Sequence, residues 1–152
     1  MPMTPAEAPQ IARRSVQFVE EKFGLELRYT VESLVFVEAV IDRIRATGAS
    51  EEQARGVLAG LGCYAGEVLV RNARASWRPA TEVKAGGPSR SPILLTLAGA
   101  RVCDPLARVF ERFADPSSDG VASLYDTALG VTGGEAERGR GSVPPRDRPG
   151  ST

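Results

Sequence analysis

The chain contains no histidine, and this absence limits the chemistry that it can perform. Ser-His-Asp and Cys-His catalytic sites need an imidazole, as does the usual proton shuttle at neutral pH. Cysteine is also scarce, because only Cys63 and Cys103 are present. Two cysteines without histidine are too few ligands for a structural zinc site, so we expect no metal and no cofactor. So few cysteines also argue against a secreted disulfide scaffold.

The chain lacks an excess of charge of either sign, since 19 basic residues balance 19 acidic ones. A dedicated nucleic-acid binder usually carries a basic excess, and so does a protein held electrostatically on a membrane surface. We therefore expect neither partner. No apolar run reaches the length of about 18 residues that a membrane span needs, and the first residues do not resemble a signal peptide. These observations favour a cytoplasmic location.

What the sequence does contain is an uncharged stretch of helical pattern that carries four glycines, residues 56–66, followed at once by Glu67. Ser50 and Gln53 form the pattern of a capping box before it, which predicts a helix over residues 50–75. Each glycine inside a helix costs about 1 kcal/mol relative to alanine, and close approach of neighbouring backbones would offset that cost. We therefore predict a central, buried helix, in which Cys63 is a small buried hydrophobe.

Apolar residues recur at helical spacing in four further segments that capping or stop residues bound. The predicted helices are residues 9–23, 31–46, 105–114 and 121–129. Alternating residues predict a strand over 77–84, with Pro79 at the edge of its sheet. Apolar composition predicts two more strands, at 93–97 and 101–103. Glu38 and Asp42, one turn apart, are expected on a solvated helix face.

The predicted fold class is α+β, with about five helices packed on a small antiparallel sheet of two or three strands. Residues 1–8 are expected to be frayed, because Pro9 is poorly tolerated inside a helix that begins earlier. Residues 9–132 are expected to form a single globular domain. Residues 133–152 contain glycine, proline, arginine and glutamate without aromatics, which is typical of a disordered tail.

The helix that holds Gly62, Tyr64, Gly66 and Glu67, with Trp77 after it, resembles a family of small uncharacterised bacterial proteins. In that family a Gly-x-Tyr-x-Gly-Glu-Val helix leads to a tryptophan-bearing strand. The resemblance extends over about residues 18–129 and leaves both ends of the chain outside it. It implies a shared fold, but the family is a domain of unknown function, so it implies no catalytic residue.

Glu67 and Arg71 are one helical turn apart, and two interpretations of them stay open. In the first, they form an ion pair that completes a buried helix. In the second, Glu67 is a carboxylate of raised pKa that acts as a general base in a cleft with Tyr64 and Trp77. Trp77 could also be a binding anchor with a rim of arginines that includes Arg101, because tryptophan and arginine are enriched at binding hot spots.

Two function classes follow from these residues. The first is a non-catalytic cytoplasmic domain that binds another protein, or a second copy of itself, through Tyr64, Glu67, Arg71, Trp77 and Arg101. The second is a small enzyme or small-molecule binder that uses Glu67 with Tyr64 and Arg71. The lack of histidine, of metal ligands and of a phosphate-binding loop motif favours the first class.

Overall fold

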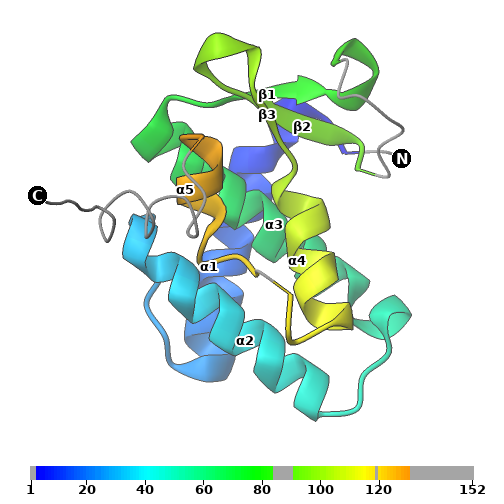
Figure 1. Cartoon of the computed structure of the whole chain (residues 1–152). Coiled ribbons are helices and arrows are strands. Elements are labelled where there is room, and N and C mark those ends of the chain that lie inside the picture. The colour runs from blue at the N-terminus through cyan, green and yellow to red at the C-terminus, as the bar shows by residue number, and fades with distance from the viewer. Residues whose placement is uncertain (1–2, 84–90, 119, 131–152) are drawn as a thin grey trace, which may run out of the picture.

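The computed structural model describes residues 3–83, 91–118 and 120–130. Most of the predicted loop at 85–92 and the whole predicted tail at 133–152 lie outside these residues. These residues form five α-helices that pack together, and a three-stranded sheet lies at one end of the helices (Figure 1). The elements are α1 (Ala8–Phe23), α2 (Leu34–Ala46), α3 (Glu51–Ala73), β1 (Ser76–Pro79), β2 (Ile93–Thr96), β3 (Val102–Cys103), α4 (Pro105–Ala114) and α5 (Leu124–Ala128). The predicted α+β class is therefore confirmed.

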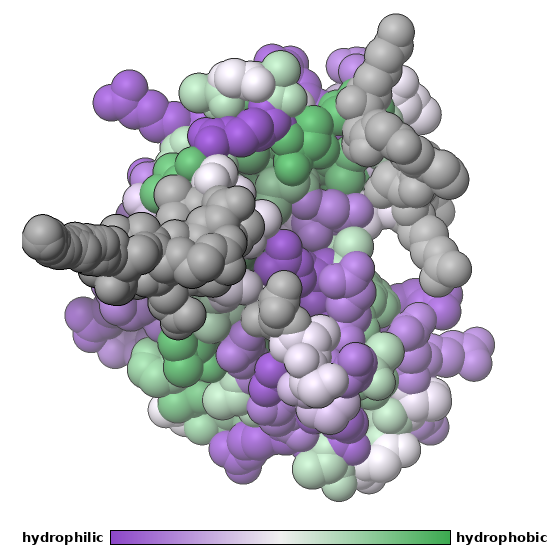
Figure 2. Space-filling model, viewed as in Figure 1, coloured by the Kyte–Doolittle hydropathy of each residue, from purple (hydrophilic) through white to green (hydrophobic). Residues whose placement is uncertain are grey.

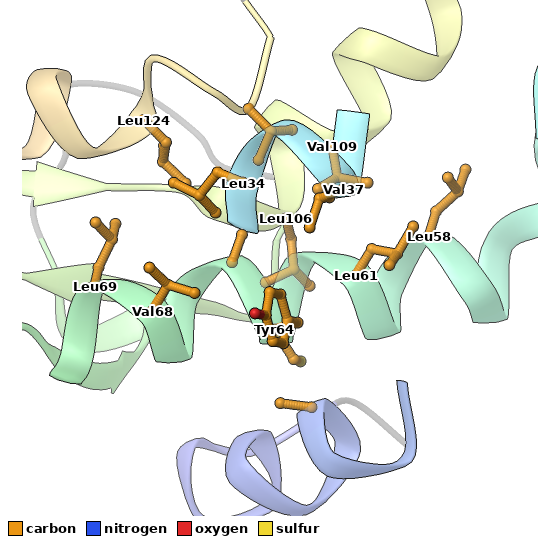
Figure 3. Packing of buried hydrophobic residues seen from close by; sticks show 14 of the residues in the cluster. Leu34, Val37, Leu58, Leu61, Tyr64, Val68, Leu69, Leu106, Val109 and Leu124 are labelled. Atoms are coloured by element: carbon orange, nitrogen blue, oxygen red, sulfur yellow. The ribbon is translucent and has the colours of Figure 1, made fainter. Parts of the chain in front are cut away.

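Helix α3 is the centre of the fold, with α1 packed on one side of it and α2 and α4 on the other (Figure 3). Every residue from 60 to 69 is buried, which confirms the predicted central helix. Leu61 and Tyr64 of α3 belong to the same buried cluster as Val37 of α2 and Val109 of α4. Because α3 is buried on several sides, its own apolar residues are distributed around the whole helix and not along one face.

The predicted close approach of a neighbouring backbone is confirmed at Gly62 and wrong at Gly56, whereas at Gly66 the neighbour is a side chain. A Cβ atom on Gly62 would stand 2.8 Å from the Cα of Leu106 in α4. One on Gly66 would overlap the indole ring of Trp77. Gly56, in contrast, faces open space, so no neighbouring backbone compensates for its helix propensity.

The chain start differs from the predicted frayed segment at residues 1–8. Residues Pro5–Glu7 form a 3-10 turn, and α1 follows from Ala8, which is fully buried. The Thr4 amide donates to Glu7 Oε1 at 2.8 Å, which holds the turn. Pro9 then falls in the first turn of α1, where a backbone N–H has no helical partner, so its missing N–H costs little.

The sheet is antiparallel with strand order β1-β2-β3, and Trp77 pairs with Leu95, which pairs with Cys103. Strand β1 is an edge strand, as Pro79 predicted. It is shorter than the predicted strand over 77–84, because a 3-10 turn at Ala80–Glu82 follows Pro79 directly. Strand β1 continues directly from the end of α3, so the sheet returns Trp77 to the surface of that helix.

Glu38 and Asp42 of α2 do not lie on a purely solvated face as predicted. The Asp42 carboxylate accepts two hydrogen bonds from Arg112 of α4, at 3.1 and 2.8 Å. Glu38 Oε2 accepts the Ala122 amide at 2.8 Å, just before α5. These acidic side chains therefore join α2 to the C-terminal part of the described chain, a partnership that the spacing within α2 does not reveal.

Candidate functional site

The C-terminal half of α3 places Tyr64, Glu67 and Arg71 at successive turns, and each has a different environment. Tyr64 is fully buried, Glu67 is 5% exposed, and Arg71 is exposed. The helical spacing brings them to one side of α3, as the sequence indicates. Their partners, however, come from two segments that the sequence does not connect to α3.

Glu67 is bound by Trp77 and not by Arg71. The indole Nε1 of Trp77 donates to Glu67 Oε2 at 2.9 Å, and the indole ring covers Gly66. Among the described residues no ion pair joins Glu67 to Arg71, so the first interpretation of this pair is wrong. The buried carboxylate is satisfied by a neutral donor from β1, which is a structural contact between strand and helix.

Tyr64 uses its hydroxyl to fix the loop before α2. The hydroxyl accepts the Tyr29 amide at 2.8 Å and lies 2.6 Å from Ser33 Oγ. Because Ser33 donates its own proton to the Thr30 carbonyl, the Tyr64 hydroxyl is the donor to Ser33. Burial raises the pKa of Tyr64, so its hydroxyl is a neutral hydrogen-bonding group and not a base.

Tyr29 is not among the binding residues that the sequence analysis predicts. Its φ is 63°, in the left-handed region that non-glycine residues seldom adopt. The amide is held by Tyr64, and the carbonyl accepts the Asn72 side chain at 2.9 Å. No local signal predicts this conformation, because the bonds that hold it come from α3.

Arg71 lies over the exposed side of Tyr29, with its guanidinium carbon 3.6 Å from the ring centroid. Burial raises the pKa of Tyr29, while the positive charges of Arg71 and Arg13 act in the opposite direction. Both arginines are exposed, and neither forms an ion pair within the described part of the chain. We call these three residues, Arg13, Tyr29 and Arg71, the Tyr29 corner.

Trp77 and Arg101 come from the two outer strands of the sheet and their neighbourhood. Arg101 precedes β3, at the opposite edge of the sheet from β1. Its guanidinium lies against Gly130, just after α5. The five predicted binding residues are therefore divided: Tyr64 is internal, Glu67 pairs with Trp77, Arg71 belongs to the Tyr29 corner, and Arg101 stands apart.

The cysteines offer no reactive thiol. Both are free and buried, and burial raises the pKa of Cys63 to about 12 and that of Cys103 to about 11. A thiol needs its thiolate form to be a good nucleophile, so neither group is poised for covalent chemistry at neutral pH.

Within the described ranges, no three histidine, cysteine, aspartate or glutamate side chains gather where they could hold a metal ion. In the same part of the chain, none of the helices combines the length and apolar character needed to cross a membrane. Hydrophobic and hydrophilic residues are interspersed on the face shown in Figure 2.

A scan against protein-family models finds no match for this chain. A search of curated proteins and a search of solved structures find none either. The resemblance to a family of small bacterial proteins therefore stays a prediction.

Proposed function

We propose that this protein is a non-catalytic binding domain that recognises an acidic segment of a protein partner through the Tyr29 corner. The observation that carries the proposal is the guanidinium of Arg71, which is stacked on Tyr29 and forms no ion pair among the described residues. The positive charge of Arg13 also acts on this tyrosine. We also propose a cytoplasmic location, which the two free cysteines support.

Stacking makes Arg71 a prepared binding group. The contact with Tyr29 orients the planar guanidinium and leaves its N–H groups at the edge, where they can donate to a carboxylate in a two-pronged pair. Tyrosine and arginine are enriched among residues that dominate binding energy. A second positive charge nearby favours a segment with more than one acidic side chain.

The loop beneath this surface is held rigidly. Tyr64 and Asn72 of α3 bind the two backbone polar groups of Tyr29, and Tyr64 also packs against its ring at 4.9 Å between centroids. Groups that are already ordered lose little conformational entropy when a partner binds. Tyr64 therefore supports the surface from within and does not contact the partner.

The alternative of a small enzyme that uses Glu67 gains no support from this arrangement. Glu67 accepts the Trp77 indole, Tyr64 is engaged with Tyr29 and Ser33, and Arg71 stacks on Tyr29. The three groups do not converge on a common point where a substrate atom could react.

The proposal is tested by measuring binding of the wild-type protein to an array of acidic peptides and to the same peptides with glutamine in place of glutamate. Arg71→Gln and Tyr29→Ala should each lower binding about tenfold, as expected for a hot-spot contact. Arg55→Gln is the matched control, because Arg55 is exposed in the first turns of α3, at the other end of the helix.

Equal binding to the acidic and the amide peptides would exclude the proposed charge recognition. A reduction by Arg55→Gln as large as that by Arg71→Gln would show a general charge effect and not a site. Size-exclusion chromatography with light scattering tests the remaining possibility of a second copy. A dimer that Arg71→Gln dissociates would replace the acidic partner by the chain itself.

A further inference from the structure

A groove of about 260 Å³ lies between α1 and α3. It exists because two glycines of α3, Gly56 and Gly60, present no side chain toward α1. A Cβ atom on Gly56 would meet nothing within 4 Å, so the space above it is open. The walls are the apolar side chains of Ile11, Phe18 and Val57.

One polar side chain at the base of this groove has no partner. Ser15 of α1 is 7% exposed, and its Oγ makes no hydrogen bond with any described residue. That oxygen would lie 3.4 Å from a Cβ atom on Gly60, so it stands at the Gly60 end of the groove. Because this oxygen lines an open groove, it has room for a ligand atom or a water.

The rim of the groove carries a positive charge. Arg14 is exposed, lines the groove, and forms no ion pair among the residues that the structure describes. An apolar wall, the Ser15 hydroxyl and the Arg14 guanidinium complement a molecule with a hydrocarbon part and a carboxylate. A site of this kind, mostly apolar with a few converging polar groups, is typical of small-molecule binding.

We propose that the groove binds a small, branched or aromatic carboxylic acid. Its hydrocarbon part packs on Ile11, Phe18 and Val57, and its carboxylate binds Arg14 and Ser15. At about 260 Å³ the groove is slightly smaller than a typical drug-sized site, which favours a ligand of only a few carbon atoms over a partner helix.

This site is independent of the proposed acidic-segment recognition. Arg13 acts on Tyr29 electrostatically, whereas the next residue, Arg14, lines the groove. Arg13 is not among the residues that line the groove, so one turn of α1 supplies a charge to each site. Substitution of one arginine or the other therefore separates the two proposals.

The test is a titration of the full-length ¹⁵N-labelled protein with isocaproate, followed by chemical shifts. The control ligand is isocaproamide, which has the same hydrocarbon part without the charge. We expect saturable shifts at residues of the groove with a dissociation constant of about 1 mM or below. Arg14→Gln should weaken binding of isocaproate about tenfold, and Arg13→Gln should not.

Gly56→Leu should fill the groove and abolish binding while the fold is retained, because its side chain enters open space. Gln17→Leu, on the exposed part of α1, is the matched control and should bind as the wild type does. No saturable shifts at millimolar isocaproate would overturn the proposal. So would equal affinity for the amide, or unchanged binding by a folded Gly56→Leu variant. None of these results bears on the acidic-peptide binding of the Tyr29 corner.

Discussion

Trp77 and Glu67 form a hydrogen bond of 2.9 Å that attaches the edge strand β1 to the C-terminal half of α3. The same indole ring covers Gly66, so one side chain both satisfies a buried carboxylate and fills the space that a glycine leaves. This contact, and not an ion pair within the helix, explains why an acidic residue can follow the apolar part of α3.

Replacement of Trp77 by phenylalanine removes the indole N–H and leaves the Glu67 carboxylate without its donor. A buried polar group that loses its partner costs about 1–3 kcal/mol of folding free energy, and the smaller ring adds a packing loss. We expect the urea midpoint to fall accordingly. In a double-mutant cycle with Glu67→Leu, the two losses should be clearly less than additive. Additive losses would mean that the bond contributes nothing.

Gly66→Ala and Gly56→Ala should change stability in opposite directions. The alanine methyl at position 66 collides with the Trp77 ring, and overpacking costs about 1–3 kcal/mol, more than the gain of about 1 kcal/mol from helix propensity. At position 56 the methyl meets open space, so only the gain remains. Thermal unfolding of the two variants against the wild type checks the sign of each change.

Tyr64→Phe should loosen the segment that carries Tyr29. The variant removes the acceptor of the Tyr29 amide and the donor to Ser33, at a cost of about 1–3 kcal/mol. Native-state hydrogen exchange should show faster exchange of the Tyr29 amide in particular. Unchanged protection of this amide would contradict the assigned hydrogen bond.

The stability that Asp42 contributes to the folded protein should be lost in acid. Hydrogen bonds from Arg112 hold the pKa of Asp42 below its usual value of 3.8. A group with a lowered pKa in the folded state stabilises the protein above its unfolded pKa, and this contribution is lost as the pH falls below about 4. Because Asp42 is 40% exposed, solvent screening limits the effect to about 1 kcal/mol or less. The free energy of unfolding, measured with urea, should decrease less steeply from pH 6 to pH 2 for Asp42→Asn than for the wild type.

The stability that the protonated Cys63 thiol contributes to the folded protein should be lost in alkali. Burial raises the pKa of this thiol from 9.0 to about 12, so the folded state disfavours the thiolate. The contribution is fully present below pH 9 and is lost as the pH rises toward 12. Cys63→Ala removes it, so the variant should lose less stability than the wild type between these values. Parallel urea unfolding curves across that range provide the measurement.

Elements that depend on local signals could be predicted from the sequence. The Ser50 and Gln53 capping box forms as expected, with bonds of 2.9 and 3.1 Å, and Asp104 accepts the Ala107 amide at the start of α4. The uncharged stretch within α3 also predicted correctly that this helix is buried. Such features need only residues within a turn of one another, so spacing reveals them.

The candidate site could be predicted only in part. Tyr64, Glu67 and Arg71 lie on one side of α3 as their spacing implies, but the sequence did not place Tyr29 among the binding residues or reveal that Trp77 bonds to Glu67. An exposed Glu–Arg pair one turn apart stabilises a helix by only about 0.2–0.5 kcal/mol, which a buried tertiary contact easily exceeds. The nearer partner in the sequence was therefore not the partner in the fold.

By itself the sequence determined the α+β class, the places of the helices and the burial of the glycine-bearing helix, because periodicity and capping act over a few residues. Only the tertiary structure decided which partner each polar side chain of α3 takes. It also decided that Gly56 opens a groove while Gly66 receives an indole ring. These outcomes depend on which segments pack against one another in three dimensions, and residue spacing along one helix carries no information about that.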